Sequence, residues 1–200
     1  MNLQEANIKD IHDPASERLR EKTGLLISGF LEETEPDFIK KHARILDDYF
    51  HQCFENSIVG PKMAVNKNLY AVIALGGYGR EEQCIYSDVD LLFLFEKSVP
   101  EDGEDLVREM IYPLWDIGLD VGYATRSIKE CVHLALEEIE VLTSLLDARF
   151  ICGMSPLYSA LMEKLGNRIT PRRSNKIIAA LIENNRQRHR YFGDSAYLLE

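Results

Sequence analysis

Three features are missing from this sequence of 200 residues: a membrane span, a secretion signal and a cysteine framework. No apolar run is long enough to cross a bilayer, and residues 1–5 are polar and acidic, unlike a signal peptide. The cysteines Cys53, Cys84, Cys131 and Cys152 are far apart and have no metal-binding spacing. Most lie in apolar stretches, where free cysteine behaves as a small hydrophobe. We therefore expect a cytoplasmic protein.

Positive charge is scarce as well. Lysine and arginine number 23 against 33 aspartate and glutamate residues, which gives a net charge of −10 at pH 7. Affinity for nucleic-acid phosphates depends on clustered lysine and arginine, so we expect no nucleic-acid partner. The lack of a long apolar run predicts that there is no membrane partner either. Hydrophobic residues make up 46% of the chain, which is enough to bury the core of one domain with a helical extension.

The first sixty residues have the apolar periodicity of helices. Asp13-Pro14 is a helix start signal, with proline at the first helical position, and residues 34–37 are another. Gly60-Pro61 is expected to end this helical region, because both residues are typical of helix ends and turns.

Short apolar runs replace the helical pattern in the middle of the chain. Residues 69–75 and 89–95 are β-prone and stop at turn-forming residues, as buried strands do. Residues 101–118 predict a helix and residues 119–126 predict a third strand. A capping box begins at Ser127, and from there to the end the pattern is helical.

These elements predict an α+β fold with a small mixed β-sheet. We expect an N-terminal helical segment over residues 1–62, an α/β core over residues 63–153 and a C-terminal helical segment over residues 154–200. N-cap residues followed by proline, at residues 155–156 and 170–171, predict helix starts in the last segment. We expect that segment to begin a longer helical domain.

Two glycines and two aspartates lie at the ends of the first two predicted strands. Gly76-Gly77 ends the first strand, and Asp88 and Asp90 flank Val89 where the second begins. Residues two apart on a strand project from the same face, so the carboxylates of Asp88 and Asp90 are expected to lie side by side. Two carboxylates that close repel each other unless a cation lies between them. Magnesium takes hard oxygen ligands of this kind. The pattern therefore predicts Asp88 and Asp90 as ligands of a catalytic Mg²⁺.

The same stretch offers groups that bind phosphate. A Gly-Gly turn lets backbone N–H groups approach phosphate oxygens, Arg80 adds a charge-assisted contact, and Ser87 adds a hydroxyl. Either motif alone is usually a simple turn or a solvated pair of acids. Both together, about ten residues apart between two strands, favour a nucleotide site that includes Gly76, Gly77, Arg80 and Ser87.

These residues resemble the DNA-polymerase-β-type nucleotidyltransferase superfamily. More narrowly, the chain is similar to the N-terminal catalytic region of the PII-protein uridylyltransferases, from about residue 69 to the end. The residues that carry this likeness form five segments: 76–80, 87–92, 114–122 with Arg126, 145–153 and 188–200. The predicted core is accordingly interpreted as a nucleotidyltransferase core.

The resemblance implies that an acceptor oxygen attacks the α-phosphorus of a nucleoside triphosphate, with Mg²⁺ present and pyrophosphate leaving. In this family the nucleotide is UTP and the acceptor is a PII-type signal protein of nitrogen regulation. Superfamily members usually use a third carboxylate from a neighbouring strand. Asp120 is the candidate, and the alternative is a surface acid at a strand edge. Asp147 lies in a helical pattern and is expected to pair with Arg149.

Four positions depart from the pattern of the family. Glu81 stands where glycine is usual, Gln83 where leucine is usual, Ile85 where proline is usual, and Tyr123 where histidine or glutamine is common. These changes leave the nucleotide and the acceptor open. The alternatives are a nucleotidyltransferase of the same fold with another nucleotide or acceptor, such as adenylyl transfer, and a non-catalytic nucleotide-sensing module.

Overall fold

The computed structural model describes residues 14–168 together with 174–175, 177–179, 182–183 and 186. The expected helix start at residues 170–171 and the similar segment 188–200 lie outside the described residues. Within the described part, every helix is too short or too polar to cross a bilayer.

Four strands form one mixed sheet in the order β3-β2-β1-β4. Strand β1 is antiparallel to β2 and to β4, whereas β2 and β3 are parallel. The predicted second strand, residues 89–95, is confirmed with the same bounds. The strands are β1 (Tyr70–Ala74), β2 (Val89–Phe95), β3 (Val121–Ser127) and β4 (Arg149–Gly153).

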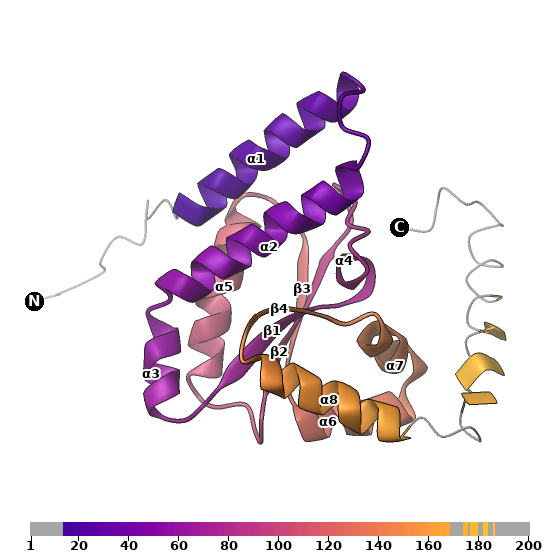
Figure 1. The fold of residues 1–200 in the computed structure, drawn as a ribbon. Helices are drawn as coiled ribbons and strands as arrows, with labels where there is room; N and C mark the ends of the chain where they lie inside the picture. The colour runs from indigo at the N-terminus through magenta and orange to yellow at the C-terminus, as the bar shows by residue number, and fades with distance from the viewer. Residues whose placement is uncertain (1–13, 169–173, 176, 180–181, 184–185, 187–200) are drawn as a thin grey trace, which may run out of the picture.

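Helices cover both faces of the sheet, so the predicted α+β class with a small mixed sheet is confirmed. Figure 1 shows α2 and α5 on one side of the strands and α6 and α8 on the other. The helices are α1 (Pro14–Leu31), α2 (Phe38–Asn56), α3 (Val59–Val65), α4 (Gly76–Gly79), α5 (Gly103–Asp116), α6 (Ile128–Glu137), α7 (Ile139–Leu146) and α8 (Ser155–Arg168).

Strand β2 is apolar on both faces because it is buried on both faces. Leu91 and Phe93 pack in the core formed with α2 and α5, whereas Leu92 and Leu94 pack in the core formed with α6, α7 and α8. Asp90 shares the second face by alternation, but it is exposed at the beginning of the strand. Asp90 is therefore an exposed acid at the end of the sheet, beyond the residues that the helices bury.

Strand β3 is an edge strand, and an aromatic cluster covers its beginning. The Trp115 indole N–H donates to the Val121 carbonyl at 3.3 Å. The Trp115 ring lies 5.2 Å from that of Tyr112 and 6.1 Å from that of Tyr123, measured between ring centroids. These three rings are partly exposed beside the edge.

Two expectations about element boundaries are wrong. The helical pattern after Ser127 hides strand β4, which pairs with β1; a short apolar run cannot be assigned to strand or helix by periodicity alone. The helical region does not end at Gly60-Pro61, since α3 contains both residues. Proline is tolerated there because it lies in the first turn, where its missing N–H has no helical partner. The capping box between Ser127 and Glu130 is confirmed.

The turn after α4 places a non-glycine residue in the left-handed region. Glu81 has φ +58°, a conformation that L-residues with a Cβ rarely adopt. Glycine adopts it without this steric cost. The structure thus gives a physical reason for the usual glycine at the position where this chain has Glu81.

We predict that Glu81→Gly raises the free energy of unfolding by up to about 1 kcal/mol, because the left-handed conformation costs an L-residue roughly 1–2 kcal/mol and the greater unfolded freedom of glycine offsets part of the gain. The matched control is Glu81→Ala, which removes the same carboxylate but keeps the Cβ. Urea denaturation of both variants measures the difference. Equal stability of the two would contradict the assignment of strain.

His42 joins α2 to the loop before β2. Its ring is buried, and Nδ1 lies 3.2 Å from the Gln83 carbonyl oxygen. A carbonyl only accepts, so Nδ1 carries the proton that is donated. Burial lowers the pKa of His42 below its ordinary value, with the bond to Gln83 opposing this in part. The ring is therefore held neutral.

We predict that acid weakens the fold through His42. Between its lowered folded pKa and the ordinary value of about 6.5, the unfolded chain binds more protons, so stability rises with pH and is lost as pH falls. His42→Asn keeps a side-chain N–H for Gln83 but does not titrate. Denaturation from about pH 7.5 to about pH 5 should show a steeper loss for the wild type, by at most about 1.4 kcal/mol per pH unit. Parallel curves for the two proteins would refute this.

Candidate active site

The Gly-Gly turn and the Asp-x-Asp pair meet at one end of the sheet. The antiparallel register pairs Ala74 with Leu91, and the Leu75 N–H donates to the Asp90 carbonyl at 2.9 Å. The end of β1 therefore lies beside the beginning of β2. Gly76 follows directly, with φ +52°, so the two predicted motifs are brought together.

The Asp90 carboxylate lies between two glycines. Its Oδ2 is 3.3 Å from the position that a Cβ on Gly76 would take, and its Oδ1 is 2.9 Å from the corresponding position on Gly122. Gly122 is the register partner of Asp90 on β3. Sequence reasoning missed Gly122 as a site residue, although an isolated glycine in a strand is a signal of close approach. Glycine on both sides leaves room for the carboxylate.

Asp88 and Asp120 lie just before their strands, and both are exposed. The Val89 N–H donates to the Asp120 carbonyl at 2.9 Å. Because Val89 pairs with Val121, continuing the register one step back places Asp120 beside Asp88. Asp90 follows one residue into β2. The backbones of the three predicted acids therefore lie at one end of the sheet.

The donor set suits magnesium. Asp88 and Asp90 offer hard carboxylate oxygens, both residues are exposed, and no Cβ at 76 or 122 occupies the space around Asp90. Mg²⁺ is commonly bound by one or two carboxylates, with waters and substrate phosphates completing the shell. Among the residues that the structure describes, no group of three or more His, Cys, Asp or Glu side chains is arranged around a common metal position. Asp120 as a further ligand stays a prediction.

Arg80 ties the glycine turn to the junction between α7 and β4. Its Nη1 donates to Asp147 Oδ2 at 2.6 Å and its Nε donates to Glu82 Oε2 at 2.7 Å. The expected pairing of Asp147 with Arg149 is therefore wrong. The reason is close packing of the backbone: a Cβ on Gly79 would lie 2.1 Å from the Asp147 carbonyl oxygen. This approach puts Asp147 within reach of Arg80, whose side chain remains 43% exposed.

A second set of contacts holds Tyr78, which lies between Gly77 and Gly79. The Tyr78 hydroxyl donates to Asp47 Oδ1 at 2.7 Å, and Arg149 donates to both Asp47 oxygens at 2.7 and 3.0 Å. Arg149 also donates to the Tyr78 carbonyl at 3.2 Å. Burial, and then the Asp47 carboxylate, raise the pKa of Tyr78 well above its ordinary value, so the phenol keeps its proton. Sequence reasoning missed Asp47 entirely.

Ser87 precedes the acidic pair and is half-buried. Its carbonyl accepts a hydrogen bond of 2.7 Å from the Gln83 side-chain amide. The structure thus places Ser87 in the loop that leads from the glycine turn to Asp88. Its predicted contact with phosphate stays a prediction.

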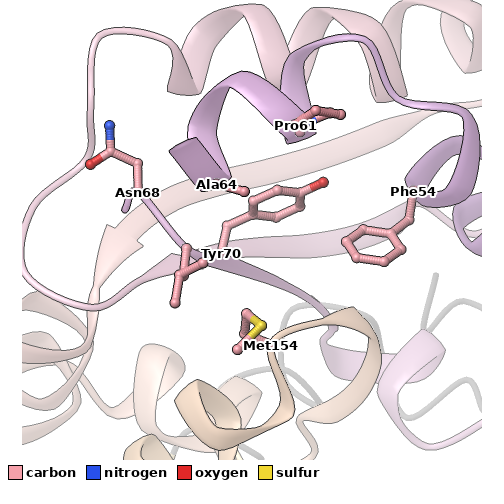
Figure 2. Close-up of a pocket in the computed structure, with 8 residues that line it drawn as sticks. Phe54, Pro61, Ala64, Asn68, Tyr70 and Met154 are labelled. Carbon is pink, nitrogen blue, oxygen red and sulfur yellow. The ribbon is translucent and has the colours of Figure 1, made fainter. Parts of the chain in front are cut away.

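An apolar cavity of about 230 Å³ lies away from these residues. Figure 2 shows it between α3, the beginning of β1 and the beginning of α8. Tyr70, which lines it, starts β1, whereas the acidic pair lies near the residues that end β1. The lining includes Phe54, Pro61, Ala64, Asn68, Tyr70 and Met154. The cavity contains none of the predicted site residues.

Comparisons with known proteins bear on the kind of domain that the chain contains. A family model described as a nucleotidyltransferase domain matches residues 62–146. A solved structure described as a toxin-antitoxin with AMP-PNP has a TM-score of 0.30 and 14% identity, and the match covers 70% of this chain and 97% of that chain. That likeness is too slight to bear on the site.

Curated relatives give the clearer comparison. A bifunctional uridylyltransferase/uridylyl-removing enzyme of Cereibacter sphaeroides is 42% identical over 130 residues, which are 65% of this chain and 14% of that protein. The enzyme of the same name from Rhodospirillum rubrum is 34% identical over 176 residues, which are 86% of this chain and 19% of that protein. The chain thus spans less than one fifth of the length of these relatives. It contains a nucleotidyltransferase domain over the matched residues and is similar in sequence to part of the bifunctional uridylyltransferase/uridylyl-removing enzymes.

Proposed function

We propose that this protein transfers UMP from UTP to a PII-type signal protein in a Mg²⁺-dependent reaction that releases pyrophosphate. The observation that carries the proposal is the position of the Asp90 carboxylate between Gly76 and Gly122, with the backbones of Asp88 and Asp120 at the same end of the sheet. The choice of UTP is supported by the names of the curated relatives. The PII-type acceptor rests on the resemblance of the sequence motifs.

The residues of the chain bind and orient the nucleotide. Asp88 and Asp90 hold Mg²⁺, which neutralises the charge that develops on the phosphate oxygens. The N–H groups of the first turn of α4, at Gly76 and Gly77, have no partners inside that helix, and we assign them to the phosphates. Arg80 and Ser87 flank these phosphates.

The acceptor needs a group that takes its proton. In the proposed reaction a hydroxyl oxygen of the acceptor forms a bond to the α-phosphorus, and the bond between the α-phosphorus and the oxygen that leads to the β-phosphate breaks. We assign Asp120 to the hydroxyl proton, because its backbone lies beside that of Asp88 in the parallel register. A carboxylate is a suitable general base when it lies within hydrogen-bond reach of the proton.

The proposal extends to domains and location. We assign residues 63–153 as the catalytic core, with residues 1–62 and 154–200 as segments on either side; the domain match over residues 62–146 supports the extent of the core. A cytoplasmic location fits the four free cysteines.

We predict that the full-length protein labels a PII-type protein when given Mg²⁺ and UTP that carries the label on its α-phosphate. Asp88→Asn and Asp90→Asn should each lower the transfer rate at least about 100-fold, because the charge that holds the metal is lost. Their melting temperatures should stay near that of the wild type, since both residues are exposed.

Three results of this assay contradict the proposal in different ways. Labelling from ATP in preference to UTP identifies adenylyl transfer. Absence of transfer from any nucleotide, with binding retained, identifies a nucleotide-sensing module. Full activity of both asparagine variants removes the acidic pair from the reaction.

A second prediction concerns Gly122. Gly122→Ala puts a methyl group 2.9 Å from the present position of Asp90 Oδ1, so the carboxylate must rotate away. We expect transfer to fall at least about tenfold, since misplacement of reacting groups by about 1 Å is costly. Stability should change little, because the displaced atom is the end of a flexible side chain. The control is Gly166→Ala in α8, where a Cβ meets open space. Equal activity of the two variants would show that the position of Asp90 does not matter.

A further inference from the structure

The two acids of the pair are held by different means. Asp90 lies inside β2, where its carbonyl accepts from the Leu75 N–H at 2.9 Å and Gly122 is its partner on β3. Asp88 lies one residue before the strand, at the end of the loop formed by residues 80–88. The sheet therefore fixes Asp90 directly, whereas the position of Asp88 depends on what orders this loop.

The side chain of Gln83 orders the end of the loop. Gln83 is 1% exposed, and its Nε2 donates to the Ser87 carbonyl at 2.7 Å. The same nitrogen lies 3.3 Å from the Asp88 carbonyl oxygen and 3.4 Å from that of Cys84. One buried amide thus gathers three backbone carbonyls around itself, including that of Asp88.

The backbone of Gln83 is fixed in turn by helix α2. His42 Nδ1 donates to the Gln83 carbonyl at 3.2 Å, and both residues are buried. The loop beyond them is open to solvent, and Tyr86 at its tip is 97% exposed. A chain of contacts therefore connects α2 to the backbone of Asp88: His42 binds the Gln83 carbonyl, and the Gln83 amide binds the Ser87 and Asp88 carbonyls.

We propose that Gln83 is a positioning residue, whose buried amide holds the backbone of Asp88 so that this carboxylate meets the metal beside Asp90. The proposal rests on the proposed function for its effect on nucleotidyl transfer. It also gives a role to a departure from the family pattern. A leucine, which is usual at this position, fills similar space but has no N–H to donate to these carbonyls.

The test begins with Gln83→Leu in the full-length protein, with Mn²⁺ as the metal probe. Removing an outer-shell partner of a ligand typically weakens metal binding about 10-fold to 100-fold, so we expect Mn²⁺ affinity measured by calorimetry to fall about tenfold. Amide hydrogen exchange in residues 84–88 should become faster, while exchange in β1 and β2 should not change. The matched control is Gln52→Leu in α2, which removes a half-buried glutamine outside the loop.

A double-mutant cycle separates positioning from a general structural effect. Once Asp88 is changed to asparagine, Gln83→Leu should weaken Mn²⁺ binding by less than about twofold, because positioning of the lost carboxylate no longer matters. In the Asp90→Asn background, Gln83→Leu should still weaken binding about tenfold. If Gln83→Leu does not fold, Gln83→Met removes the donor with a more flexible side chain.

The outcomes distinguish the inference from the proposed function. Wild-type Mn²⁺ affinity and exchange in Gln83→Leu, or equal loss of affinity in the Asp88→Asn and Asp90→Asn backgrounds, overturns the positioning role. A wild type that binds Mn²⁺ but transfers no UMP overturns the proposed function alone, since affinity and exchange still decide the role of Gln83. A wild type that does not bind Mn²⁺ overturns both.

Discussion

The ion pair between Asp47 and Arg149 is the constraint on which the site depends. It joins α2 to β4, and both partners also bind Tyr78, one through its hydroxyl and the other through its carbonyl. Both side chains are partly buried, so removing one partner leaves the other with a charge that water solvates only in part. Because Tyr78 lies inside the glycine turn, this pair fixes the turn against the sheet, and with it the glycine that borders the Asp90 carboxylate.

The contacts that hold the glycine turn extend beyond the matched domain. The nucleotidyltransferase match covers residues 62–146, so Asp47 precedes it and Arg149 follows it. Arg80, within the match, reaches Asp147 just outside it. The glycine turn is thus held from both sides by residues that the family description leaves out. The helix α2 also carries His42, so it supports both ends of the segment between β1 and β2.

Local patterns predicted the elements that depend on local physics. Residues 89–95 form a strand with the expected bounds, because burial on both faces requires a continuous apolar run. Ser127 caps α6 as predicted, because a capping box needs particular residues three positions apart. The juxtaposition of Gly76 with Asp90 follows from antiparallel pairing of adjacent strands. The bond between Asp47 and Arg149 spans 102 positions, and no local spacing records such a contact. For the same reason the predicted partner of Arg149 was the neighbouring Asp147, whereas its actual partner is the distant Asp47.

The edge position of β3 has a consequence for association between molecules. An uncovered edge strand offers backbone groups to any other strand and invites aggregation. Within the described residues, β3 is the edge strand next to β2, which carries Asp90, and no further strand pairs with its outer side. Trp115 blunts this liability by occupying the Val121 carbonyl. The Val121 carbonyl is therefore not available to a strand of a second molecule, and association through this edge would first have to displace the Trp115 indole.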